Sequence, residues 1–481
     1  MPDTTLTQDP AAPDDTATAD LLRWTAEQAI AWRTGLGERH VGADPSVTPA
    51  SLRDGLGGPL PRTGTDPRTV IDDLVRAADP GLVAMSGPRY HGFVIGGSVP
   101  SALAADWLTS TWDQNAGGYL VTPSAAIVEE VAGAWLVELL GLPVGTSVGF
   151  ATGATLASTT CLAAGRHAVL RKAGWDVEED GLQGAPTVRV IVGTDVHVSV
   201  LMALRYLGFG RGRAERVPTD DQGRMDPGAL AAMLEGHTGP LIVCAQAGEV
   251  NTGAFDPMAR IVEVVRRVPD AWLHLDGAFG LWAAASPRLR HLVVGHDGAD
   301  SWATDGHKWL NVPYDSGFAF VRDAAAHRAA MGSSAAYLPP APAATRDPWD
   351  YVPELSRRAR GFTAWAAIRE LGAAGIAALV ERDHDLAVRM ADRLARHPGV
   401  TIANEVVLNQ VLVGLGDPDL TRDVAARVQR EGTTWFGTTV FKGTPWARIS
   451  VSSWWTTEDD IDRSADAILR CLDEALAARR G

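Results

Sequence analysis

Lys308 is the residue of this chain best placed for nucleophilic chemistry. It follows the segment 299–305 and a glycine, which puts its amine on a tight turn at the end of a strand. Trp302, Trp309 and Leu310 make the surroundings apolar. Because desolvation lowers the pKa of an amine, such a lysine can attack an aldehyde and form a Schiff base. The alternative is a solvated loop lysine, which is the commoner environment.

Asp276 ends a second apolar segment, residues 271–275, and small residues follow it. A carboxylate there lies at the carboxyl edge of a parallel sheet, where open α/β sheets bind their ligands. An acid at this position can keep the pyridine nitrogen of pyridoxal phosphate protonated, so that the ring accepts electrons. Taken alone, Asp276 could equally be a helix N-cap or a turn residue.

Two further segments predict an anion site and a ring-stacking site. Gly153, Ala154 and Thr155 open a helical pattern, and the free amides at a helix start attract phosphate. His197 follows the strand-like segment 188–193 at the mouth of a helix, so its imidazole also reaches the sheet edge. Small-residue helix starts and buried structural histidines are common, so neither segment is diagnostic alone.

The ordered motifs His274-x-Asp276-Gly-Ala and His307-Lys308-Trp309 resemble those of the group II pyridoxal-phosphate decarboxylases. This is the family of aromatic-amino-acid, glutamate and diaminobutyrate decarboxylases, and the similarity runs from about residue 87 to the C-terminus. The resemblance implies pyridoxal 5'-phosphate as cofactor and a homodimer. It also implies an α/β fold of the PLP-transferase type, with a mostly parallel central sheet and a small C-terminal α/β domain.

The resemblance also implies a role for each candidate residue. Lys308, Asp276 and His197 are the expected catalytic residues: they hold the cofactor aldehyde, contact its ring nitrogen and stack on its ring. The aromatic stretch near residue 90 could equally be an edge strand packed into the core, and Arg448 could equally form a surface salt bridge. The other expected contacts are to the cofactor from Gly153, Ala154, Thr155, Ala278 and His307, and to the substrate from Tyr90, His91, Phe93 and Arg448.

Two departures from the family pattern leave the exact reaction open. Glu249 stands where the family usually carries Thr or Asn near the cofactor hydroxyl, and its charge would repel a phenolate unless it points away or one group is protonated. The proton-donating loop tyrosine of the family is expected at residues 347–349, which contain none, and the nearest are Tyr337 and Tyr351.

The predicted function is decarboxylation of an apolar or aromatic L-amino acid to the amine. Transamination, C–C cleavage and decarboxylating aldehyde synthesis with the same cofactor are alternatives, and so is a non-catalytic dimeric scaffold. The last is disfavoured because Lys308, Asp276 and His197 occur together.

Composition limits the class of protein. The 43 basic and 58 acidic residues give a net charge of −15, which disfavours nucleic acid or an anionic membrane as partner. Cys161, Cys244 and Cys471 lie far apart in apolar stretches, which favours reduced core thiols and no metal site. No apolar run reaches 18 residues and no leader pattern opens the sequence, so we expect a cytoplasmic enzyme that acts on small molecules.

The chain is long enough for a large and a small domain. An amphipathic helix is expected from Asp20 onward, and in the resembled family the partner subunit often buries its apolar face. We predict a disordered tail over 1–19, a dimer-contacting helical segment over 20–110, a PLP-binding large domain over 111–370 and a small α/β domain over 371–481.

Overall fold

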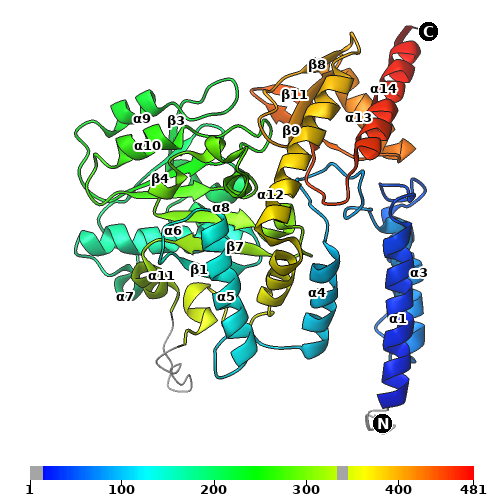
Figure 1. The fold of residues 1–481 in the computed structure, drawn as a ribbon, viewed down its shortest axis with the longest axis horizontal. Helices are drawn as coiled ribbons and strands as arrows, with labels where there is room; N and C mark the ends of the chain where they lie inside the picture. Colours follow the sequence, from blue (N-terminus) through cyan, green and yellow to red (C-terminus); the bar gives the residue numbers. More distant parts are fainter. Residues whose placement is uncertain (1–14, 333–344, 481) are drawn as a thin grey trace, which may run out of the picture.

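A seven-stranded sheet forms the centre of the computed structural model, which describes residues 15–332 and 345–480. Its strand order is β1-β7-β6-β5-β4-β2-β3 (Figure 1). β7 is antiparallel to both neighbours and the other adjacent pairs are parallel, which confirms the predicted mostly parallel sheet. The strands are β1 (Ser147–Ala151), β2 (Arg189–Gly193), β3 (Glu215–Val217), β4 (Leu241–Gln246), β5 (Trp272–Asp276), β6 (Ser301–Asp305) and β7 (Gly317–Val321).

Helices cover both faces of this sheet, which is why its strands are apolar almost throughout. Successive residues of a strand enter different cores: Val243 and Leu273 pack on one face, while Ile242 and Trp272 pack on the other. The helices of this domain are α5 (Pro123–Leu139), α6 (Ala154–Lys172), α7 (Val177–Asp180), α8 (Val198–Tyr206), α9 (Pro227–Leu234), α10 (Met258–Val265) and α11 (Ala324–Met331).

An N-terminal arm, formed by α1 (Asp15–Gly35), α2 (Pro49–Leu56) and α3 (Pro67–Ala78), stands beside α4 (Pro100–Trp112) at one side of the molecule (Figure 1). α1 contributes no buried residue. The helix already includes residues 15–19, which the sequence assigned to a disordered tail, and the rest of that tail lies outside the described residues.

α12 (Gly361–Leu394) connects the two domains and bends at Gly372, whose φ of 60° interrupts the helix. The sequence predicted two helices here, over 363–371 and 376–396. α12 is long and apolar enough to cross a membrane, yet it packs against α4, α5 and α14, as a core helix does.

The small domain is a four-stranded antiparallel sheet in the order β10-β11-β9-β8, packed against two helices. This confirms the predicted small α/β domain. β8 and β10 were not predicted, because they are half-exposed and lack a continuous apolar run. Its elements are β8 (Val400–Ile402), β9 (Gln410–Leu415), α13 (Pro418–Glu431), β10 (Gly437–Phe441), β11 (Thr444–Ser450) and α14 (Glu458–Arg480).

Candidate active site

Three of the predicted residues lie at the carboxyl edge of the large sheet. Asp276 ends β5, and Lys308 lies on the single π-helical turn Gly306–Leu310 that follows β6. His197 is the N-cap of α8, just after β2. Because β2, β4, β5 and β6 run parallel in register, their ends bring these side chains to one place.

The amine of Lys308 is held in a largely enclosed position. Its Nζ lies 2.9 Å from Oδ2 of Asp305, and 17% of its side chain is exposed. The ring centroid of Phe279 lies 5.8 Å from the same atom. The backbone of Gly96 passes so close that a Cβ there would come within 1.8 Å of the Lys308 carbonyl oxygen. The aromatic and glycine-rich segment near residue 90 therefore runs directly over the lysine turn.

Asp276 is buried within electrostatic reach of Lys308 and His197. Its Oδ1 accepts a hydrogen bond from the Ala278 amide at 3.1 Å, and its Oδ2 accepts one from Ser199 Oγ at 3.5 Å. Burial raises the pKa of Asp276, while the charges of His197 and Lys308 lower it. A protonated ring nitrogen placed against this carboxylate would partly offset the cost of its burial.

His197 is oriented by its own helix. Its Nδ1 accepts a hydrogen bond from the Ser199 amide at 3.3 Å and lies 2.7 Å from Ser199 Oγ. The neutral ring therefore carries its proton on Nε2. Burial lowers the pKa of His197, so that the uncharged imidazole is favoured. The side chain of Gln246 accepts from the His197 amide at 2.9 Å and fixes the backbone of the turn.

The predicted anion site lies next to Lys308. Gly153 is the N-cap of α6 and offers no side-chain cap, and the first amide of the helix, that of Ala154, donates to Oδ1 of Asp305. A Cβ at Gly153 would come within 3.1 Å of Cε1 of His307, so a glycine allows the close approach. Ala154 and Thr155 are the first two helical residues, and φ of Gly153 is 170°, in the extended region.

Asp305 is a central residue that the sequence interpretation missed. Its Oδ1 accepts a hydrogen bond from the Ala154 amide at 2.5 Å and lies 3.4 Å from Nε2 of His307, while its Oδ2 pairs with Lys308. The available signal was its place three residues before Lys308 at the end of a strand. Tyr314 was also missed; its ring stacks on His307 with centroids 4.2 Å apart. Burial and Asp305 raise the pKa of Tyr314.

Of the three aromatic candidates for substrate contact, Tyr90 and Phe93 pack on Trp435, whereas His91 contacts Ser464. Tyr90 stacks on Trp435 with centroids 4.9 Å apart, and burial raises its pKa to about 12. Phe93 also faces Trp435 and is 59% exposed. His91 is fully buried with Nε2 3.3 Å from Ser464 Oγ, and burial lowers its pKa to about 4. The structure thus brings His91 to the small domain rather than to the lysine turn.

Arg448 extends from β11 toward the same edge. Its guanidinium donates to the Val250 carbonyl at 3.4 Å, and within the described residues no carboxylate lies at ion-pair distance from it. Burial lowers the pKa of Arg448, and its charge in turn lowers the pKa of His197. The arginine is therefore not part of a surface salt bridge. The charge of Glu249 acts on it and raises its pKa against the effect of burial, and Arg448 lies within electrostatic reach of the imidazole.

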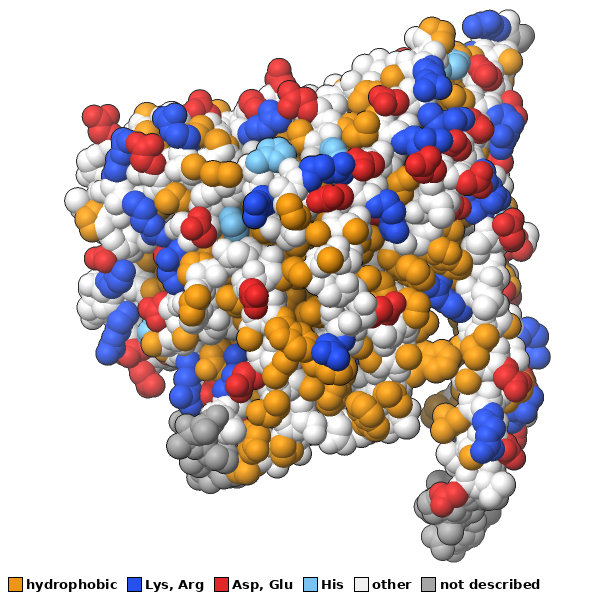
Figure 2. Space-filling view, in the orientation of Figure 1, with side chains coloured by type: hydrophobic (Ala, Val, Ile, Leu, Met, Phe, Trp, Pro, Cys, Tyr) orange, Lys and Arg blue, Asp and Glu red, His pale blue; other side chains and the backbone are white. Residues whose placement is uncertain are grey.

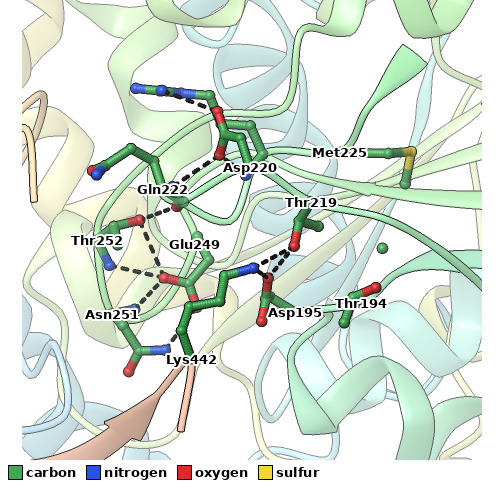
Figure 3. Close-up of polar contacts among 12 residues, drawn as sticks. Thr194, Asp195, Thr219, Asp220, Gln222, Met225, Glu249, Asn251, Thr252 and Lys442 are labelled. Atoms are coloured by element: carbon green, nitrogen blue, oxygen red, sulfur yellow. Dashed lines mark hydrogen bonds and ion pairs between the residues drawn. The ribbon is translucent and has the colours of Figure 1, made fainter. Parts of the chain in front are cut away.

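Glu249 points into its own loop, which is one of the arrangements that the sequence left open (Figure 3). Its carboxylate accepts hydrogen bonds from the amides of Asn251 and Thr252, at 2.7 and 2.8 Å, and from both of their side chains. Burial raises the pKa of Glu249 against these four donors. The residue orders the loop after β4.

Of the candidate loop tyrosines, the one that the structure describes, Tyr351, is not brought to Lys308. Tyr337 lies outside the described residues. Tyr351 packs under the guanidinium of Arg346, which lies 3.8 Å from its ring centroid, and contacts the ring of His327. Residues 347–349 form the start of a 3₁₀ turn on the β1 side of the sheet.

Comparison with known proteins identifies a family model, two relatives and one solved structure that this chain resembles. Residues 49–415 match the model described as the pyridoxal-dependent decarboxylase conserved domain. Tryptophan decarboxylase 1 of Oryza sativa subsp. japonica is 25% identical over 465 residues, covering 90% of this chain and 89% of that protein. The 4-hydroxyphenylacetaldehyde synthase of Rhodiola rosea is 24% identical over 438 residues, covering 87% and 88%. The crystal structure of Oryza sativa TDC with PLP and tryptamine shares the fold, with a TM-score of 0.89 at 22% identity over 97% of this chain and 99% of that one.

Proposed function

We propose that this chain, which belongs to the pyridoxal-dependent decarboxylase family over residues 49–415, removes the α-carboxylate of an apolar or aromatic L-amino acid and releases the amine and CO₂. Family membership confirms the predicted resemblance and the pyridoxal 5'-phosphate cofactor, and it makes the protein a carboxy-lyase. The observation that carries the proposal is the convergence of Lys308, Asp276 and His197 at one edge of the sheet.

The site fits the cofactor group by group. Lys308 offers the amine for its aldehyde, Asp276 offers a carboxylate for its ring nitrogen, and the α6 amides of residues 153–155 offer donors for its phosphate. When bound, the cofactor supplies an electron sink for the electron pair that the departing CO₂ leaves behind. Asp276 maintains this sink by holding a proton at the ring nitrogen. Ala278 and His307 support the site indirectly. Ala278 contacts Asp276, and His307 contacts Asp305.

The two groups that face the substrate carboxylate are His197 and Arg448. With Nδ1 of His197 occupied by Ser199, its Nε2–H is free to donate to a carboxylate oxygen, and the flat ring can cover the cofactor. Arg448 supplies the positive charge that offsets desolvation of the carboxylate before it leaves as neutral CO₂.

We expect an apolar or aromatic side chain to be preferred, because the other arginine of the aromatic segment is not free to bind an acidic one. Arg89, the other arginine near the aromatic segment, is already paired with Asp460 at 3.2 Å and donates to the Thr433 carbonyl. Tyr90 and Phe93 instead offer aromatic rings, both packed on Trp435, with Tyr90 buried and Phe93 exposed. We take these two residues as the substrate-contacting pair, with His91 supporting them from the small domain.

A competition experiment tests the proposal. Purified protein is incubated with PLP and equal concentrations of phenylalanine, tyrosine, tryptophan, glutamate and aspartate, and the products are identified by mass spectrometry. We expect an aromatic amine as the main product. A preference for glutamate or aspartate that is lost in Arg448→Ala would contradict the substrate assignment while leaving decarboxylation intact.

Decarboxylating aldehyde synthesis is the second candidate function. The observation that favours it is the placement of Tyr351 away from the lysine turn, with no tyrosine at residues 347–349 to protonate the substrate carbon. In that reaction O₂ is consumed, and the aldehyde, ammonia, hydrogen peroxide and CO₂ are released. Measuring O₂ uptake and peroxide alongside the amine separates the two reactions, because simple decarboxylation consumes no oxygen.

We also propose a homodimer, from the apolar surface of the N-terminal arm. Leu22 and Ile30 of α1 are exposed, although a helix gains most of its stability from packing an apolar face. Hydrophobic side chains gather on the body of the molecule opposite the arm, around α4, α5 and the lower part of α12 (Figure 2). A second copy of this chain would cover both surfaces. Light scattering over a concentration series tests the association, for which we expect a dimer mass.

A further inference from the structure

Lys442 reaches from the small domain to the large domain beside the candidate active site (Figure 3). It stands in the two-residue turn between β10 and β11, where both it and Gly443 have positive φ, of 49° and 78°. Such turns favour glycine or asparagine at the first position, so a lysine there has a conformational cost. The chain has only two other lysines, Lys172 and Lys308, against many arginines.

The ammonium group of Lys442 ties together the ends of two parallel strands. Its Nζ lies 2.6 Å from Oδ2 of Asp195, just after β2, and 2.7 Å from Oγ1 of Thr219, just after β3. The Thr219 hydroxyl also donates to the same carboxylate oxygen. The three groups form a closed set of hydrogen bonds, because the ammonium donates to both oxygens and the hydroxyl donates to the carboxylate.

This contact lies on the turn that carries His197. Asp195 is two residues before His197, and the side chain of Gln246 binds both: its Nε2 donates to the Asp195 carbonyl at 3.3 Å and its Oε1 accepts from the His197 amide. Gln246 therefore holds the turn from within the sheet. Lys442 holds it from the small domain, through the Asp195 carboxylate.

We propose that Lys442 is a positioning residue for His197: by fixing the Asp195 turn from the small domain, it sets where the imidazole lies over the cofactor. The inference rests on the proposed function, in which His197 covers the cofactor ring. It makes the geometry of the catalytic edge depend on the docking of the small domain.

Stability of the domain contact is not the main effect of Lys442. Its side chain is 36% exposed and that of Asp195 is 18% exposed, and ion pairs with this much solvent access contribute little to folding. The two domains are also joined by Arg224 and Glu405 at 2.6 Å, and by further hydrogen bonds from Thr439 to Asn251 and from Asn404 to Thr252. A variant at position 442 should therefore fold and keep its domains together.

The Arg224–Glu405 pair provides a matched control, since it also spans the two domains but does not touch the Asp195 turn. We would compare Lys442→Met, Lys442→Arg and Glu405→Gln as holoenzymes loaded with PLP. The measurements are the visible circular dichroism of the bound PLP and its rate of dissociation. For Lys442→Met we expect a weakened dichroic band and PLP release about tenfold faster, a size typical of coupling between contacting residues. Lys442→Arg should restore part of both, and Glu405→Gln should match the unmodified protein.

The same comparison in a His197→Ala background distinguishes positioning from a general structural effect. If Lys442 acts through the imidazole, the Lys442→Met change in dichroism and release rate should disappear once His197 is absent. Equal behaviour of Lys442→Met and Glu405→Gln, or an undiminished effect in the His197→Ala background, would overturn the inference alone. An unmodified protein that retains no PLP would overturn the proposed function and, with it, this inference.

Discussion

At the carboxyl edge of the large sheet each functional side chain rests on buried neighbours, whereas the N-terminal arm presents its apolar residues to solvent. Asp276 and Asp305 end strands whose residues are all buried, and Lys308 follows the second strand by three residues. α1, by contrast, runs for 21 residues without a single buried one. The residues at this sheet edge are thus packed within the single chain, while α1 leaves exposed the apolar side chains that the proposed dimer would cover.

The largest effect that would test this contrast is at Lys308. Replacement of Lys308 by Ala should abolish both turnover and the PLP that borohydride fixes to the protein, because no other amine lies beside Asp305. Peptide mapping after reduction identifies the modified residue among only three lysines. Lys172→Ala, which removes a surface lysine paired with Asp270, is the control and should keep the fixed cofactor. A reducible adduct at another lysine would show that the edge is built around a different amine.

The next effect in size is at Asp276. Asp276→Asn should keep PLP bound but lower kcat by about 10² or more, because an unprotonated pyridine ring is a poor electron sink. Ala278 N donates to Oδ1 of Asp276, and Ser199 Oγ lies 3.5 Å from its Oδ2. An amide of the same shape can accept from Ala278 through its oxygen and donate to Ser199 Oγ through its NH₂ group. Retained cofactor with reduced kcat is the expected result from absorption spectra and steady-state rates. A fully active Asn variant would remove Asp276 from the mechanism.

A smaller effect concerns acid stability of the buried region. His91 is fully buried and its pKa is lowered to about 4, so between pH 6.5 and 4 the unfolded chain binds a proton at this site that the folded chain does not. The free energy of unfolding should therefore fall as the pH falls through this window, by about 3 kcal/mol from His91 alone. Buried Asp383, whose pKa is raised to about 7, acts in the opposite direction.

Urea unfolding at several pH values isolates the contribution of His91. In His91→Asn the contribution of Asp383 is unchanged, so the difference in slope between variant and unmodified protein belongs to the histidine. We expect a flatter dependence on pH in the variant. Parallel curves over pH 6.5 to 4 would mean that the ring is protonated in the folded chain.

The sequence predicted that Lys308, Asp276 and His197 lie at one edge of the sheet, and the structure places them there for a physical reason. Lys308, Asp276 and His197 each follow an apolar run, and that pattern marks a strand end whatever the rest of the chain does. The sequence interpretation missed Asp305, because it is the last residue of β6 and looks like part of the strand. Its carboxylate nevertheless contacts Lys308. Its role depends on a turn geometry that residue types do not specify.

Long-range packing accounts for the other differences. His91 was expected to contact substrate, but its surroundings come from Ser464, more than 370 residues away along the chain. From the sequence, Glu249 was expected to place a negative charge near the cofactor hydroxyl unless it pointed away. Only the fold of its loop reveals the four donors that bind its carboxylate. The two helices predicted on either side of residue 372 are confirmed, because the non-helical φ and ψ of Gly372 separate the two halves of α12.

The smallest expected effect, on the folding of the single chain, is at the arm. Ile30 is 53% exposed in α1, so Ile30→Ser removes little buried surface and should change the free energy of unfolding of the monomer by less than about 0.5 kcal/mol. Ile376 of α12, a fully buried isoleucine, is the matched control: Ile376→Ser should cost at least about 3 kcal/mol, from a cavity and a buried hydroxyl. If the arm packs on a second copy, Ile30→Ser should nevertheless shift the dimer equilibrium toward monomer in a dilution series followed by light scattering. A variant that associates as tightly as the unmodified protein would place the dimer contact elsewhere, and a large loss of monomer stability would show that α1 is already packed within its own chain.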